Sequence, residues 1–175
     1  MDDGNPSSFG KSLYFGHIPE ALVVPYPAID PDERSNLQLV IDAFNKFAHA
    51  QIDSRKIDED GKLPKAVLDG MKELGLFGLA IPEEYGGLGL SVTGYARAMQ
   101  AVAAVDGSIA VTIGGHQSIG CKGVILFGTD AQKRKYLPRL ATGEMVAAFA
   151  LTEPGSGSDA ASIKTRAIEQ ADGSF

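Results

Sequence analysis

The chain has 175 residues, of which 44% are hydrophobic and 22% are charged, and its formal net charge is −6. The composition is ordinary for a globular protein, and the length suits one domain or a small domain plus part of another. The negative charge gives no electrostatic support to nucleic-acid binding. A single cysteine excludes a disulfide framework and a cysteine-based zinc site, and no apolar stretch predicts a membrane span.

The N-terminal region, residues 1–31, predicts an extended arm. Five of the nine prolines fall within it, and proline fixes the backbone and interrupts helices. The first residues lack the basic start and the apolar run of a secretory signal, and they are too acidic for a transit peptide. We therefore expect a cytoplasmic protein, or one of the mitochondrial matrix if the organism is a eukaryote.

Residues 32–144 predict a helical domain. Helical periodicity begins near Asp32, after which apolar residues recur every three or four positions. A second helix is expected to start at Pro64 and to close at Gly75, because proline suits a first helical position and glycine a C-terminal cap. Ser91 is expected to cap a third helix.

Two more helices are predicted from their caps. A fourth helix is expected over residues 108–127, with Ser108 as its cap. Thr129 and Gln132 have the spacing of a capping box, which predicts the start of a fifth helix. Pro138 is expected to bend or end that helix early, because its ring lacks the amide hydrogen and crowds the preceding turn.

Helical periodicity stops after this point, and residues 145–175 predict the incomplete start of a β domain. One strand is expected at 146–151 and a second at 163–168, where the residues alternate weakly. Asp172-Gly173 is a hairpin signal, but no return strand follows it in the sequence. The expected fold is therefore mainly α, a helical domain followed by the beginning of a β domain.

The stretch most informative about chemistry is 150–159, which reads Ala-Leu-Thr-Glu-Pro-Gly-Ser-Gly-Ser-Asp. It lacks the lysine of a Walker loop, the glycines of a dinucleotide fingerprint and the flanking glycines of a nucleophile elbow. A tight, hydroxyl-rich turn remains, in which Gly155 and Gly157 let backbone amides approach an anion closely. Such a turn can hold a flavin and its pyrophosphate, although a plain serine and glycine surface loop is the commoner explanation of such a composition.

The stretch 150–162 resembles the signature of the acyl-CoA dehydrogenase family. Further runs resemble the same family in the same order, at 74–78, 81–89 and 135–138. The run 115–120 and the arm between Ser8 and Pro27 are similar to its very-long-chain branch. Together these motifs cover almost the whole chain, and several motifs in one order are far more specific than one glycine loop.

The resemblance implies a flavoenzyme. Members of this family remove a proton from the α-carbon of a fatty acyl-CoA thioester and pass the β-hydrogen to FAD as a hydride, which gives the trans-2-enoyl-CoA. An electron-transfer flavoprotein then reoxidises the flavin. The family fold has an N-terminal helical domain, a middle β-barrel-like domain and a C-terminal four-helix bundle, and we expect the full-length protein to be a homo-oligomer. This chain would hold the first domain and the opening of the second.

The resemblance also assigns roles to residues of the signature. Phe149, Leu151 and Thr152 should lie along the isoalloxazine ring of FAD, with Thr152 donating a hydrogen bond to its pyrimidine end. Gly157 and Ser158 should meet the FAD pyrophosphate or the neighbouring CoA part of the substrate. The catalytic base of the family is a carboxylate near the C-terminus of the complete protein, so no catalytic residue is expected in these 175 residues.

Other candidate residues have simpler interpretations. Ala110 and Gly114 are four residues apart and share a helix face. Small side chains there would leave a groove for a long acyl chain, and close helix packing explains the pattern equally well. Glu153 is expected to be a turn or salt-bridge carboxylate, and His116 a hydrogen-bonded core residue. No metal site is predicted.

Two alternative functions remain open. An acyl-CoA oxidase shares the fold and passes its electrons to oxygen, although the run 152–159 favours a dehydrogenase. A non-catalytic helical interaction module would explain why a catalytic base and a finished β domain are lacking in this sequence.

Overall fold

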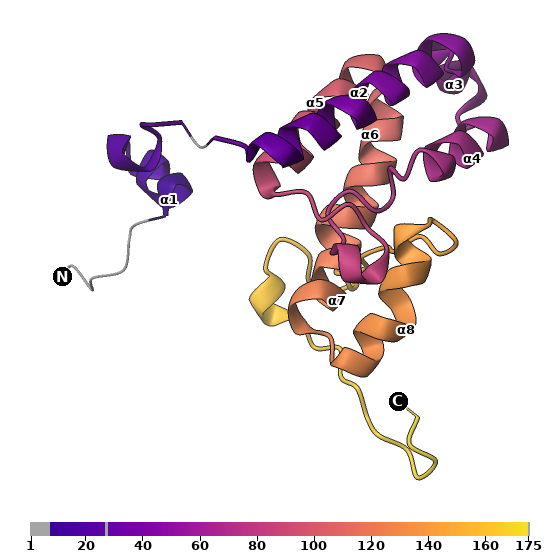
Figure 1. Ribbon diagram of the computed structural model, residues 1–175. Coiled ribbons are helices and arrows are strands. Elements are labelled where there is room, and N and C mark those ends of the chain that lie inside the picture. Colours follow the sequence, from indigo (N-terminus) through magenta and orange to yellow (C-terminus); the bar gives the residue numbers. More distant parts are fainter. Residues whose placement is uncertain (1–7, 27, 175) are drawn as a thin grey trace.

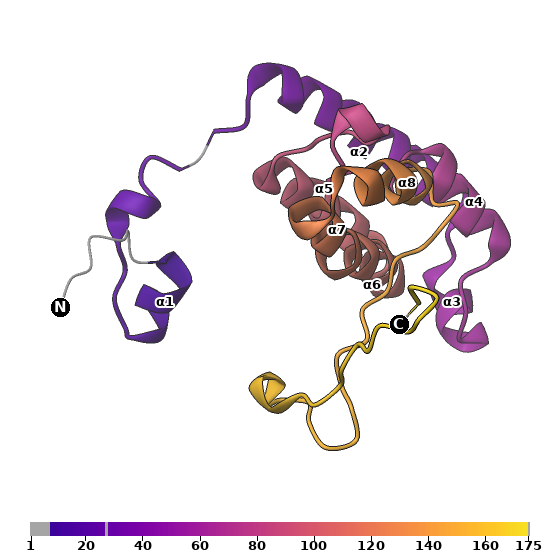
Figure 2. The ribbon, with the colours of Figure 1, turned by 90° about the horizontal axis from the view of Figure 1, so that it is seen from below.

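The computed structural model describes residues 8–26 and 28–174, and it is mainly helical, as predicted. Figure 1 shows a body of helices, an N-terminal arm that stands apart from it, and a C-terminal segment that leaves it on another side. The same separation of the arm is visible in the view turned by 90° (Figure 2). No helix among the described residues is long and apolar enough to cross a membrane.

The body is built around three long helical stretches. Helix α2 (Pro31–Gln51) packs against α5 (Val92–Val105), and α5 packs in turn against α6 (Gly107–Gly114). Asp30 caps α2 by accepting hydrogen bonds from the amides of Asp32 and Glu33. Ser91 caps α5, as predicted. The apolar faces of these helices form one large core cluster, which also takes in the buried segment that follows α4.

Two shorter helices close one end of this body. Helix α3 (Ser54–Asp60) was not predicted from the sequence, because it is too short to show periodicity and buries only Ile57. Helix α4 (Lys65–Glu73) follows Pro64, which serves as its N-cap and not as its first residue. The chain then passes through the short η2 (Glu83–Tyr85).

Residues 107–127 form one continuous helical stretch with an irregular middle. The cap is Asp106, whose carboxylate accepts from the amides of Ser108 and Ile109, so the prediction of Ser108 as the cap was wrong. An aspartate two residues before Ser108 starts the helix earlier and offers its first amides a charged acceptor. Between α6 and α7 (Lys122–Phe127) the helix widens into a π-helical segment, η3 (Gly115–Cys121).

Helix α8 (Asp130–Ala141) begins at the predicted capping box of Thr129 and Gln132, in which both hydrogen bonds are present. Pro138 lies inside this helix, which runs on to Ala141, so the prediction that it ends the helix early was wrong. The last turn buries Leu137 and Leu140 in a second core cluster. This packing outweighs the amide hydrogen bond that proline cannot make.

The C-terminal segment differs from the prediction of a β domain. The described part of the chain contains an isolated antiparallel bridge between Glu153 and Ser156 and the short η4 (Ala160–Ser162), and the strands expected at 146–151 and 163–168 are not formed. A strand needs a neighbour to satisfy its backbone groups, and the described residues offer none here. The turn at Asp172-Gly173 is present, with φ +78° at Gly173.

The N-terminal arm is not wholly extended, which corrects the prediction for the part that is described. It contains α1 (Phe9–Tyr14), capped by Ser8, and η1 (Glu20–Leu22). Its aromatic side chains are largely exposed, among them Tyr14 and Phe15. Residues 1–7 and Pro27 of the predicted arm lie outside the described residues.

Candidate functional site

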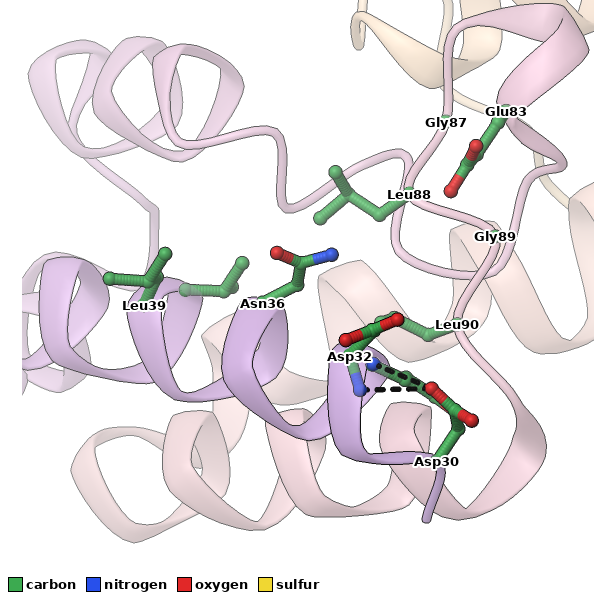
Figure 3. A pocket seen from close by; sticks show the side chains of 11 residues that line it. Asp30, Asp32, Asn36, Leu39, Glu83, Gly87, Leu88, Gly89 and Leu90 are labelled. Atoms are coloured by element: carbon green, nitrogen blue, oxygen red, sulfur yellow. Dashed lines mark hydrogen bonds between the residues drawn. The ribbon is translucent and has the colours of Figure 1, made fainter.

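A hollow of about 780 Å³ lies between α2 and the loop after η2 (Figure 3). Its lining includes four carboxylates, those of Asp30, Asp32, Glu33 and Glu83. Two of them already serve the fold, since Asp30 caps α2 and Glu33 Oε1 accepts from the amide of Ser91 at 2.8 Å. An acidic lining repels a pyrophosphate, so this hollow is a poor match for FAD or CoA.

The residues predicted to contact flavin lie between Phe149 and Ser158, in the segment that follows α8. Phe149 and Leu151 are apolar and exposed. Thr152 and Ser158 are exposed as well, and Gly157 is half-buried. One short segment therefore presents apolar side chains and hydroxyl groups to its surroundings.

A small turn organises this segment. The amide of Glu153 donates to the carbonyl of Ser156 at 3.0 Å, and the amide of Ser156 donates back at 3.1 Å. The Ser156 hydroxyl is buried and donates to the carbonyl of Asp159. The Ser156 hydroxyl is therefore occupied within the turn, whereas the exposed hydroxyls of Thr152 and Ser158 can meet a ligand.

The turn brings Thr152 and Gly157 side by side. A Cβ atom added at Gly157 would lie 3.4 Å from Thr152 Cγ2, whereas one added at Gly155 would meet nothing within 4 Å. No described residue accepts a hydrogen bond from the amides of Gly155, Gly157 or Ser158. Free amides beside glycines and hydroxyls suit an anionic group, and the neighbouring apolar side chains suit a ring, so these residues fit FAD.

Glu153 holds the turn to the chain that follows it, which confirms its expected role in a turn. Its carboxylate accepts from the amides of Lys164 at 2.7 Å and Thr165 at 3.0 Å, and from the Thr165 hydroxyl. These bonds, that from the Thr165 hydroxyl first, lower the pKa of Glu153. The carboxylate is thus committed to the loop and not aimed at a substrate.

The π-helical segment carries two buried polar side chains that the sequence did not connect to this site. Gln117 accepts from the amide of Ala80 at 2.7 Å and donates to the carbonyl of Leu76, also at 2.7 Å. His116 is a hydrogen-bonded core residue, as expected, and its partners include the amide of Ala147. A polar pair in an apolar helix was the signal present in the sequence, but the partners come from distant segments.

Cys121 lies beside His116 and has no exposed surface. Burial raises the pKa of its thiol to about 11. The thiol therefore stays protonated at neutral pH and acts as a small apolar side chain.

Ala110 and Gly114 face the inside of the body. Ala110 packs against the large core cluster, and a Cβ atom added at Gly114 would lie 3.8 Å from Met99 Cε on α5. Other apolar side chains of the same helical stretch are exposed, among them Val111 and Ile119. Among the described residues no group of three or more metal-binding side chains is present.

Comparison with known proteins places the helical body in a family. The model of the acyl-CoA dehydrogenase N-terminal domain matches residues 35–144. The chain is 45% identical over 169 residues to the mitochondrial very long-chain specific acyl-CoA dehydrogenase of Homo sapiens, a match that covers 96% of this chain and 26% of that protein.

Two solved structures are similar in sequence and in fold. An acyl-CoA dehydrogenase from Bacillus anthracis, complexed with FAD, is 39% identical with a TM-score of 0.66 and covers 79% of this chain and 24% of that chain. Butyryl-CoA dehydrogenase from Megasphaera elsdenii is 32% identical with a TM-score of 0.69 and covers 84% of this chain and 39% of that chain.

This chain spans about a quarter of the length of the curated relatives it matches. The family model covers more than half of the chain and ends just before the segment that holds Phe149 and Thr152. The similarity to the very long-chain specific enzyme spans 96% of this chain and is not confined to separate motifs. The chain belongs to the acyl-CoA dehydrogenase family, whose N-terminal helical domain it carries.

Proposed function

We propose that the complete protein is an FAD-dependent dehydrogenase that converts a long-chain fatty acyl-CoA to the trans-2-enoyl-CoA. The observation that carries this proposal is the 45% identity to a very long-chain specific enzyme over 96% of the chain. The segment 149–158 supports it independently, because it combines exposed apolar side chains with free amide and hydroxyl donors.

Each residue of the segment has a proposed task. Phe149 and Leu151 give a flat apolar contact for the flavin ring and keep water from it. Thr152 donates a hydrogen bond where negative charge accumulates on the ring, while Gly157 and Ser158 bind the pyrophosphate or the CoA part of the substrate. FAD, when bound, supplies the hydride acceptor. The base that removes the α-proton is expected outside these 175 residues.

The proposed partners follow from the same reading. An electron-transfer flavoprotein would take up the electrons, and the complete protein would be a homo-oligomer. The proposed compartment is the cytoplasm, or the mitochondrial matrix in a eukaryote.

We also propose Ala110 and Gly114 as determinants of acyl-chain length, acting through the spacing of α5 and α6.

The visible spectrum of the complete protein tests the proposal. We expect flavin absorbance that is bleached anaerobically by a long-chain acyl-CoA and restored by an electron-transfer flavoprotein. Rapid reoxidation by oxygen with formation of peroxide would instead support the acyl-CoA oxidase. Absence of flavin absorbance after reconstitution with FAD would support the helical interaction module and overturn the proposal.

A further inference from the structure

The π-helical segment η3 places two side chains that are five residues apart on the same side of the helix. His116 Nε2 lies 3.5 Å from the sulfur of Cys121, and both residues are buried. Such widened turns interrupt the regular helix at a cost in backbone geometry and recur at functional sites. The helical stretch here directs an imidazole inward, between Phe77 in the segment after α4 and Leu140 of α8.

The imidazole of His116 joins three separate parts of the chain. Nε2 donates to the carbonyls of Phe77 and Leu140, each at 3.1 Å, and Nδ1 accepts from the amide of Ala147 at 3.0 Å. Carbonyls can only accept and an amide can only donate, so the proton resides on Nε2. The ring of Phe77 packs edge-on against the imidazole, with centroids 5.2 Å apart.

The imidazole is uncharged in this arrangement. Desolvation by burial lowers the pKa of His116, and the hydrogen bonds to Leu140 and Phe77 offset this only in part. The ionisable group in contact with the ring is Cys121, which is itself protonated. A neutral imidazole is the form that can accept the Ala147 amide on Nδ1 while it donates on Nε2.

A second contact, between Gly120 of η3 and Ala147, also holds Ala147 in place. A Cβ atom added at Gly120 would lie 2.5 Å from Ala147 Cβ and 3.1 Å from its carbonyl carbon, so only glycine allows this approach. Ala147 is therefore held by one hydrogen bond and one close backbone contact, both from η3. Phe149 and Thr152 follow only two and five residues later.

We propose that His116 is a positioning residue for the flavin: its bond to the Ala147 amide sets where the segment 149–152 leaves the helical body and so aligns Phe149 and Thr152 for FAD. This inference rests on the proposed function. The segment from Val146 to Leu151 is exposed apart from Ala147. Its fixed point therefore lies at the contact with η3.

Two substitutions of His116 in the complete protein separate the two ends of the ring. In His116→Gln the side-chain amide can still donate to the carbonyls of Phe77 and Leu140, but the acceptor for Ala147 is lost. In His116→Asn the side-chain oxygen replaces Nδ1 and can still accept from Ala147, but the donor to the carbonyls is lost.

The two variants should differ in which property they change, FAD binding or stability. His116→Gln should raise the Kd for FAD about tenfold, the effect of about one hydrogen bond, and shift the flavin reduction potential and visible band shape. His116→Asn should lower the melting temperature more than His116→Gln while keeping the wild-type FAD affinity and potential. A purely structural histidine would instead make FAD affinity follow the melting temperature in both variants, which would overturn the inference.

A matched pair of glycine substitutions provides a second test that leaves His116 in place. Gly120→Ala should displace Ala147 and weaken FAD binding. Gly123→Ala, three residues later on the same helical stretch, adds a methyl group with nothing within 4 Å and should leave FAD binding unchanged. Equal FAD affinity in the two variants would count against the inference.

Failure of the proposed function gives a different pattern from failure of this inference. If the wild-type complete protein binds no FAD after reconstitution, the proposed function and the inference are both overturned. If the wild type binds FAD and His116→Gln binds it with the same Kd and potential, only the positioning role is overturned.

Discussion

Asp106 lies between α5 and α6, and its carboxylate accepts from the amides of Ser108 and Ile109, each at 2.9 Å. The Ser108 hydroxyl also donates to it, at 2.5 Å. Desolvation acts to raise the pKa of this buried group, but the hydrogen bonds outweigh it and lower the pKa. One side chain thus closes the turn that sets the direction of α6.

Replacing Asp106 should reduce stability in a pH-dependent way. Asp106→Ala removes the cap and should cost about 1 kcal/mol at pH 7. The folded pKa lies below the unfolded one, so the contribution of the charge is present at neutral pH and is lost as pH falls through the folded pKa. Urea unfolding at several pH values measures this.

Asp106→Asn is the matched control, because its side-chain oxygen can still accept from both amides. It should retain most of the capping energy at pH 7 and lose the acid sensitivity that this carboxylate contributes. An Asp106→Ala variant as stable as wild type at pH 7 would contradict the role of this residue as the cap.

At the scale of elements, the helix ends depend on glycines with left-handed backbone. Gly75 after α4 has φ +69° and Gly143 after α8 has φ +70°. They differ in their surroundings, since a Cβ atom at Gly75 would meet nothing within 4 Å and one at Gly143 would lie 2.9 Å from the buried ring of Phe77. The same backbone angle therefore carries a packing constraint at only one of them.

The two glycines make a matched pair of substitutions. Gly75→Ala should cost about 1–2 kcal/mol for the left-handed backbone alone. Gly143→Ala should cost about 1–3 kcal/mol more, because Phe77 cannot move without disturbing the core. Chemical denaturation measures the free energy of unfolding of both variants. Equal losses in the two would show that the Phe77 ring moves aside without destabilising the core.

The proposed role of Gly114 in acyl-chain length can be tested at the contact between α5 and α6. Gly114→Gln in the complete protein would fill the space toward Met99 and should shift the preference from long toward medium acyl chains. The control is Gly123→Gln, which points into open space and should leave the preference unchanged. Steady-state kcat/KM for two acyl-CoA lengths is the measurement, and an unchanged ratio in Gly114→Gln would rule out the role in chain length.

At the scale of the whole molecule, the described chain exposes several large apolar side chains. Val111, Ile119 and Phe127 lie along one helical stretch, and Phe149 lies on the segment beyond α8. Apolar surface of this extent normally contacts another domain or another molecule. The chain matches only 26% of the length of the human relative, which leaves room in the complete protein for a domain that covers this surface.

The isolated 175-residue chain should therefore self-associate and bind the dye ANS. The complete protein should self-associate less and bind less ANS. Phe127→Ser, at a residue that is 85% exposed, should lower the ANS fluorescence of the isolated chain without loss of helicity by circular dichroism. A monomeric isolated chain with no ANS binding would show that this surface needs no cover.

The sequence correctly predicted structural features that depend on residues close together in the chain. The caps at Ser91 and Thr129 were correct because a hydroxyl and the amides it binds lie within one turn. The periodicity of α2 was also sufficient, since one helix face carries its own signal. For the candidate site, the sequence indicated Thr152, Gly157 and Ser158, and the structure brings Thr152 against Gly157.

Only the tertiary structure decided the features that join distant segments. Pro138 continues a helix because Leu140 is buried beyond it, and the expected strands at 146–151 and 163–168 do not form because the described residues supply no partner strand. The link from His116 to Ala147 spans 31 positions. Local chemistry fixes a cap or a turn, but packing energy and hydrogen-bond partners across the chain are properties of the folded molecule.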